Sequence, residues 1–68
     1  MRMIVGKIVD EGNRVLLYAK QRNVIFRFHV IATPESGKAL KVGDLIEYSE
    51  GGVNFGWLIG KVGQRDRI

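Results

Sequence analysis

The segment from Arg22 to Ile31 alternates between two kinds of side chain, and this alternation constrains the fold more than any other feature of the chain. Successive side chains of a β-strand point to opposite faces, so the pattern predicts a strand with one apolar face. The opposite face combines a cation and an imidazole with one apolar side chain. The apolar face carries Val24, Phe26, Phe28 and Val30, and the other face carries Ile25, Arg27 and His29.

Four other segments are predicted to be strands, because they are rich in β-branched or aromatic residues and are bounded by turn residues. Glycine at position 6 is expected to mark a bulge or a bend within the first of them. The second strand is predicted to point Val15, Leu17 and Ala19 inward, and Arg14, Leu16, Tyr18 and Lys20 outward. The four segments are Met3–Asp10, Arg14–Lys20, Leu45–Ser49 and Val53–Val62.

The long connection from Ala32 to Val42 contains the single proline of the chain. Thr33 is expected to cap one helical turn that begins at Pro34, since threonine is favoured at the N-cap and proline at the first helical position. Gly37 follows too closely for a long helix. The connection therefore predicts one short turn of helix between the third and fourth strands.

Five short strands with almost no helix, in 68 residues without cysteine, predict an all-β fold that closes its sheet to remove exposed edges. An SH3-like barrel is the alternative. A meander of three strands, a longer connection and a final hairpin favour a small five-stranded antiparallel OB-type barrel. We expect one domain over residues 1–63 and a polar tail over residues 64–68.

Positive charge is concentrated in the first half of the chain. The whole sequence has 11 Lys and Arg against 7 Asp and Glu, a formal net charge of +4 and a pI of about 9.9. Residues 1–30 hold six of these cations and only Asp10 and Glu11 as acids. Plain solubility would explain a net charge of this size. A basic half also favours a polyanionic partner, of which nucleic acid is the commonest.

Three phrases occur in an order that resembles the cold-shock domain, a compact OB-fold family. Gly6-Lys7-Ile8 resembles the Gly-Lys-Val of its first strand, and Phe26-Arg27-Phe28-His29-Val30 lies over its Val-Phe-Val-His-Phe motif. Leu40-Lys41-Val42-Gly43-Asp44-Leu45-Ile46 is similar to the phrase that leads into its fourth strand. The resemblance covers nearly the whole chain and implies binding of single-stranded RNA or DNA, with a chaperone-like role that keeps RNA unstructured.

The chain departs from that family where the family stacks bases on aromatic rings. The family's Lys-Gly-Phe-Gly-Phe-Ile strand is replaced by Asn13-Arg14-Val15-Leu16-Leu17-Tyr18, and Asp10 stands near the place of an exposed tryptophan. Most of the stacking platform is therefore expected to be missing, so nucleic-acid binding is expected to be weak, dominated by electrostatics and sensitive to salt. Phe55 and Trp57 are predicted to lie in the core, because burying large aromatics stabilises a small barrel.

The remaining outward residues make up the predicted site. Tyr18 and His29 would stack on bases, while the cations would contact phosphates or, for Arg27, stack as well. Each has a structural alternative: His29 or Arg27 as ordinary exposed residues of a strand, and Tyr18 as a ring that fills the barrel end. The predicted nucleic-acid-binding residues are Lys7, Arg14, Tyr18, Lys20, Arg22, Arg27 and His29.

The composition argues against catalysis. One histidine and no cysteine exclude a Cys/His dyad, the carboxylates are scattered, and no phosphate-binding loop is present. We therefore expect a protein that is not an enzyme, has no metal or other cofactor, does not bind a membrane and lies in the cytoplasm. The alternative to single-stranded binding is a protein-interaction module on the same barrel, with a homodimer as one form of it, that uses an outward aliphatic patch to which Ile25 belongs. Binding to structured RNA, as on a ribosome, is a third hypothesis.

Overall fold

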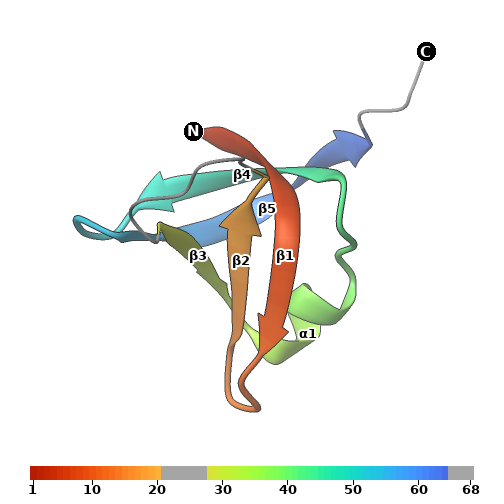
Figure 1. Ribbon diagram of the computed structural model, residues 1–68, viewed down its shortest axis with the longest axis horizontal. Helices are drawn as coiled ribbons and strands as arrows, with labels where there is room; N and C mark the ends of the chain where they lie inside the picture. The colour runs from red at the N-terminus through yellow and green to blue at the C-terminus, as the bar shows by residue number, and fades with distance from the viewer. Residues whose placement is uncertain (21–27, 65–68) are drawn as a thin grey trace.

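The computed structural model describes residues 1–20 and 28–64, and in this part of the chain it contains five strands and one short helix (Figure 1). Most of the described residues lie in strands, as the sequence predicts. In chain order the elements are β1 (Arg2–Asp10), β2 (Val15–Ala19), β3 (His29–Ala32), α1 (Pro34–Lys38), β4 (Asp44–Glu50) and β5 (Phe55–Gln64).

The strands form one sheet that closes on itself in the order β1-β2-β3-β5-β4, with β4 paired back to β1. All pairs are antiparallel except β3 and β5, which run parallel. The expectation of a wholly antiparallel sheet is therefore wrong. A closed ring with an odd number of strands cannot alternate direction at every pairing, so at least one neighbouring pair must run parallel.

The strand bounds follow the sequence-based expectations with small shifts. β5 continues to Gln64, which the sequence assigned to the polar tail, because Asp44 of β4 still pairs with that residue. The predicted helical turn is confirmed: Thr33 Oγ1 accepts a hydrogen bond from the Ser36 backbone N–H at 3.1 Å, and Pro34 opens α1. The predicted third strand is described from His29 onward, and its start at Arg22 lies outside the described residues.

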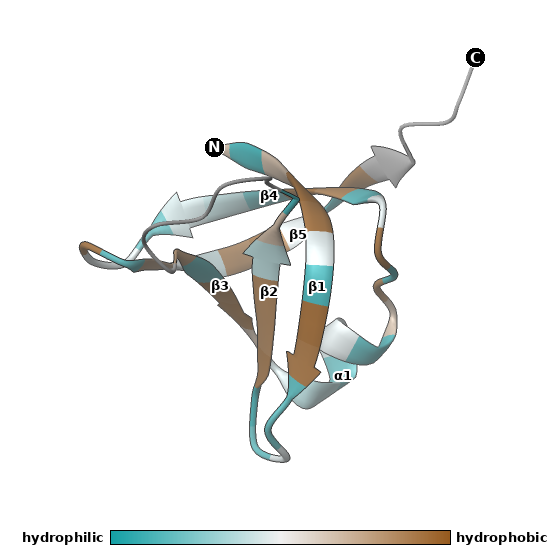
Figure 2. Ribbon diagram, viewed as in Figure 1, coloured by the Kyte–Doolittle hydropathy of each residue, from teal (hydrophilic) through white to brown (hydrophobic). Residues whose placement is uncertain are grey.

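The core lies inside the ring and is formed by buried apolar side chains of the strands together with Leu40. Much of β1, β2 and β3 is brown in Figure 2, which marks their hydrophobic residues. Val5, Leu17, Val30 and Ile46 are fully buried. The inward placement of Val15 and Leu17 on β2, and of Val30 on β3, is thus confirmed.

Leu16 points outward, as the sequence predicts, but it is only 6% exposed. Its neighbours across the sheet are Val9 of β1 and Ile31 of β3, and both are partly buried. Adjacent apolar side chains on three strands therefore shield each other from water on the outer face as well.

Gly6 interrupts the pairing of β1 with β2, as the sequence predicts. The register shifts between Val5 and Lys7, which is the mark of a bulge. A Cβ atom at Gly6 would lie 2.6 Å from the Cα atom of Lys20 and 2.9 Å from its nitrogen. Glycine is needed here because the backbone of Lys20 approaches too closely for any side chain.

Asp44 is the buried polar side chain among the described residues, at 3% exposure. Its Oδ2 atom accepts a hydrogen bond from the Lys41 backbone N–H at 2.8 Å and lies 3.6 Å from Lys61 Nζ. These two partners compensate the carboxylate for its loss of water. They also tie the turn before β4 to the middle of β5.

Candidate functional site

A row of four side chains crosses the outer face of the sheet from β1 to β5. The cross-strand register aligns Lys7 with Tyr18, Tyr18 with His29 and His29 with Phe55. Lys7 Nζ lies 6.0 Å from the centre of the Tyr18 ring, which is within reach of a cation–π interaction. The ring centres of Tyr18 and His29 are 5.8 Å apart, and those of His29 and Phe55 are 6.2 Å apart and nearly parallel at 22°.

Trp57 extends this row along β5. Its ring meets that of Phe55 edge to face, with centres 5.5 Å apart and planes at 90°. The side chain is 50% exposed. Tyr18, His29, Phe55 and Trp57 thus form a continuous set of rings over β2, β3 and β5, which we call the aromatic row.

The prediction that Phe55 and Trp57 lie in the core is wrong for both residues. Parallel pairing with β3 aligns them with His29 and Ile31, on the outer face, and aligns Gly56 with the buried Val30. A Cβ atom at Gly56 would lie 2.5 Å from the Ser49 carbonyl oxygen, so the inner position has no room for a side chain. The glycine between two aromatics was the signal available in the sequence, since it marks the crowded face.

The β4–β5 hairpin holds the two outer rings in place. Gly51 and Gly52 each donate a backbone hydrogen bond to the Phe55 carbonyl, at 3.0 and 3.1 Å. A Cβ atom at Gly51 would lie 2.5 Å from the Trp57 Nε1 atom and 2.6 Å from the Phe55 ring. Both rings therefore lie directly against the glycine backbone, and this contact restricts how they can turn.

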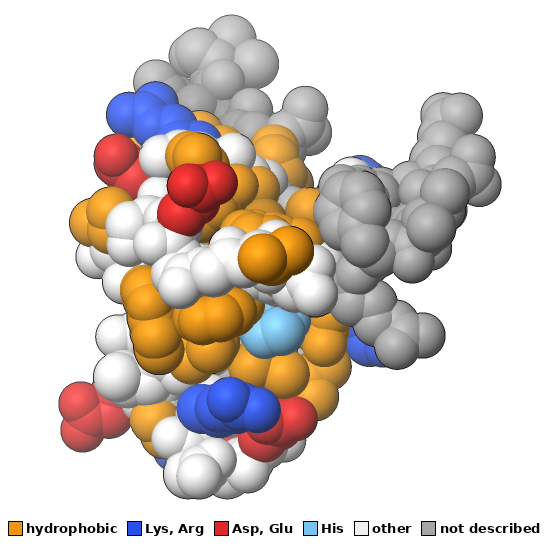
Figure 3. All heavy atoms as spheres, turned by 90° about the vertical axis from the view of Figure 1, so that its left-hand side faces the viewer, with side chains coloured by type: hydrophobic (Ala, Val, Ile, Leu, Met, Phe, Trp, Pro, Cys, Tyr) orange, Lys and Arg blue, Asp and Glu red, His pale blue; other side chains and the backbone are white. Residues whose placement is uncertain are grey.

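A second row on the same face consists of the aliphatic side chains of Val9, Leu16 and Ile31, and we call it the aliphatic row. These residues are aligned across β1, β2 and β3, and Ile31 is aligned in turn with Trp57 of β5. Figure 3 shows the resulting surface, in which the pale-blue histidine lies among orange apolar side chains. The outer face thus offers an apolar and aromatic surface around His29, rather than the solvated strand face of the structural alternative.

The predicted cations are distributed around this surface. Lys7 is exposed at the β1 end of the aromatic row. Arg14 lies at the start of β2, where its Nε–H donates to Glu11 Oε1 at 2.7 Å across a half-exposed ion pair. Lys20 is exposed directly after β2, and its backbone N–H donates to the Ile4 carbonyl at 3.1 Å. Arg22 and Arg27, together with Ile25, lie outside the described residues.

The structure therefore brings Lys7, Tyr18 and His29 into one row, with Arg14 and Lys20 beyond the two ends of β2. Within residues 1–20 and 28–64, no three His, Cys, Asp or Glu side chains gather in a way that could hold a metal ion. No helix in the same ranges is long and apolar enough to cross a membrane.

No family model, curated protein or solved structure matches this chain. The geometry of the outer face is therefore the basis for any functional conclusion.

Proposed function

We propose that this protein binds single-stranded nucleic acid on the outer face of an OB-type barrel, in the manner that its resemblance to cold-shock domains implies. The strand order β1-β2-β3-β5-β4 and the helix between β3 and β4 support the OB-type assignment. OB-folds bind oligonucleotides on the face of their second and third strands and through the loops that join strands one and two and strands four and five. The aromatic row occupies the corresponding face here.

The observation that carries the proposal is the aromatic row itself. Base stacking on an aromatic side chain contributes about 1–3 kcal/mol per base and depends little on sequence, because every base has a π face. Tyr18 and His29 supply rings on β2 and β3, and Phe55 and Trp57 supply rings on β5. The rings missing from the second strand are thus replaced by rings on the fifth. RNA and DNA strands both fit this mode, since stacking uses the base rather than the sugar.

Cations around the row would bind the phosphates. Lys7 lies at the β1 end of the row and Arg14 lies at the start of β2. Arg14 keeps two terminal amino groups that can donate to a phosphate oxygen while its Nε–H contacts Glu11. Lys20, Arg22 and Arg27 remain predicted phosphate ligands. For single strands, log K against log salt has a slope of about −0.7 for each phosphate neutralised. Binding is therefore expected to weaken steeply as salt rises.

The test is a titration of labelled single-stranded oligonucleotides, followed by anisotropy over a series of salt concentrations. Tyr18→Ala should weaken binding by about 5- to 150-fold, the equivalent of one lost stacking interaction. Lys7→Ala should weaken binding as well, because it removes a cation from the end of the aromatic row. Lys38→Ala is its charge control, because Lys38 is exposed on α1 and lies outside the aromatic row. Equal binding by wild type and Tyr18→Ala, with both folded, would reject the proposal.

A second candidate function rests on the aliphatic row. Val9 and Ile31, which remain partly exposed on either side of the buried Leu16, form an apolar surface that could bind another protein or a second copy of this chain. In that case Ile31→Asp would abolish association while Lys7→Ala would have little effect. Sedimentation at increasing concentration, with no nucleic acid present, would reveal a homodimer.

A further inference from the structure

A groove opens where β3 ends and β5 continues. The two strands pair from His29 with Phe55 to Ile31 with Trp57, after which the chain leaves β3 at Ala32 and turns into α1. β5 runs on to Gln64 without that neighbour. The space left between α1 and β5 has a volume of about 480 Å³, within the range of about 300–1,000 Å³ typical of small-molecule sites.

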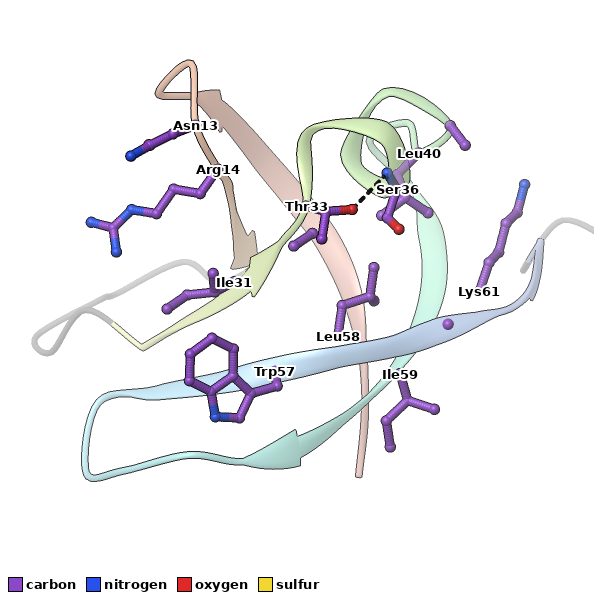
Figure 4. A pocket seen from close by; sticks show the side chains of 13 residues that line it. Asn13, Arg14, Ile31, Thr33, Ser36, Leu40, Trp57, Leu58, Ile59 and Lys61 are labelled. Atoms are coloured by element: carbon purple, nitrogen blue, oxygen red, sulfur yellow. Dashed lines mark hydrogen bonds between the residues drawn. The ribbon is translucent and has the colours of Figure 1, made fainter.

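The groove has an apolar floor with an aromatic side chain at one end (Figure 4). Leu58 points from β5 toward α1, Trp57 lies beside Ile31 at one end, and Lys61 rises at the other. Ile31 and Trp57 also belong to the outer face described above. The groove is therefore a continuation of that face rather than a separate surface.

The charges that line the groove are all positive. Among the described residues that line it are the two cations Arg14 and Lys61, and none is acidic. Both cations already have a carboxylate partner, since Lys61 Nζ lies 3.6 Å from Asp44 Oδ2 and Arg14 Nε lies 2.7 Å from Glu11 Oε1. Arg14 is the better placed to bind an anion, because only its Nε–H contacts Glu11 and its two terminal amino groups can still donate. This balance favours an occupant that carries negative charge.

Polar side chains stand at the rim beside α1. Thr33 Oγ1 accepts the Ser36 backbone N–H at 3.1 Å, which leaves its hydroxyl hydrogen able to donate to a ligand. Asn13 and Ser36 add an amide and a second hydroxyl group. A planar heterocycle with hydrogen-bonding edges would match an apolar floor, an indole ring and such a rim.

We propose that this groove binds one nucleotide of the strand that crosses the aromatic row. The base would stack on the exposed part of Trp57 and lie over Ile31 and Leu58, and its phosphate would bind Arg14. This inference rests on the proposed function, since it assigns the next nucleotide of the same strand. It adds a binding position between α1 and β5 that shares Trp57 with the aromatic row.

Gly60 offers a way to fill the groove without disturbing the barrel. It lines the groove, and a Cβ atom built there meets no atom within 4 Å. Gly60→Leu should therefore fold normally and occupy part of the space intended for the base. Ala39→Leu is a second filling variant from the opposite wall, because Ala39 is exposed and also lines the groove. Val42→Leu is the control, since Val42 is 61% exposed and lies outside the groove.

The experiment titrates isotopically labelled protein with oligothymidylates of increasing length and follows the backbone amide signals by NMR. Amides of Tyr18 and His29 report the aromatic row, and those of Ser36 and Gly60 report the groove. With the longer strands we expect both sets to shift. Filling the groove should weaken binding of the longer strands on the order of tenfold and leave the shortest bound strand unaffected.

The outcomes separate the two proposals. Shifts confined to Tyr18 and His29, with unchanged affinity in Gly60→Leu and Ala39→Leu, would overturn the groove inference and leave the aromatic row as the site. No shift in either set would overturn the proposed function and this inference with it. A sedimentation coefficient that rises with concentration in wild type but not in Gly60→Leu would assign the groove to a second copy of the chain, and would also overturn the inference.

Discussion

Replacing Trp57 with alanine removes the most exposed ring of the aromatic row. Half of the side chain is accessible, while the Nε1 edge lies against Gly51 and the ring meets Phe55 at 90°. A base can therefore cover only part of the indole, so we take the lower part of the stacking range, about 1–2 kcal/mol. Loss of that contact should raise the Kd by about 5- to 30-fold. Stability should fall less, because the ring is half exposed and its edge-to-face contact is worth about 0.5–1.5 kcal/mol.

Fluorescence gives the assay directly, because Trp57 is the one tryptophan of the chain. Stacking of a base on the indole should quench its emission in wild type, and anisotropy of a labelled strand measures the affinity of wild type and Trp57→Ala alike. Trp57→Phe, which keeps a ring, should recover much of the lost affinity. Val62→Ala is the control, since Val62 is exposed on the same strand but outside both the aromatic row and the groove. An unchanged Kd for folded Trp57→Ala, or binding without any quenching, would refute the stacking argument.

Three further predictions follow from the same structure. Lys7→Ala should reduce the steepness of log K against log salt by about 0.7, because one phosphate contact is lost, while Lys38→Ala leaves it unchanged. Equal slopes for wild type, Lys7→Ala and Lys38→Ala would contradict a phosphate contact by Lys7. Gly6→Ala should destabilise the fold by about 1–3 kcal/mol, since Lys20 backbone atoms lie 2.6 and 2.9 Å from the new Cβ atom. Gly60→Ala should be neutral or slightly stabilising, because its Cβ atom meets no atom within 4 Å. Thermal melting of the two variants measures the difference. Asp44→Asn should cost about 1.5–3 kcal/mol and lower Tm by roughly 4–8 °C per kcal/mol, because a charge-assisted bond to the Lys41 N–H is weakened; an unchanged Tm would contradict this role.

The sequence was sufficient to predict the strands and the inward face of β2 and β3. Alternation identified Leu17 and Val30 as core, and the Thr33-Pro34 pair identified the helical turn, because these signals depend on near neighbours in the chain. Gly6 also marked its bulge correctly. Local periodicity in the sequence was therefore enough to predict most of the secondary structure.

The outer face could not be predicted in the same way. Whether Phe55 and Trp57 face the core depends on the register of β5 against β3, which are separated by α1 and β4. Alternation in β5 places the two aromatics on one face but does not say which face is inside. The size of the two aromatic side chains favoured the core, but the crowding around Gly56 leaves no room for a side chain on the inner face, so the aromatics lie outside. The groove was missed for the same reason, since it is formed by elements that meet only in three dimensions.

The short parallel seam between β3 and β5 has a consequence for how the chain folds. Hairpins β1–β2 and β4–β5 join neighbouring segments, whereas the seam joins His29 to Phe55 across α1 and β4 and consists of three residue pairs. The chain must lose the conformational entropy of the intervening loop before such a contact adds any stability. We expect the seam to form late on the folding pathway, with mutations at Val30 accelerating unfolding more than they slow folding. The same seam carries His29 and Phe55, so the ligand-binding face would be completed only after the two hairpins have formed, and a bound strand would slow its reopening.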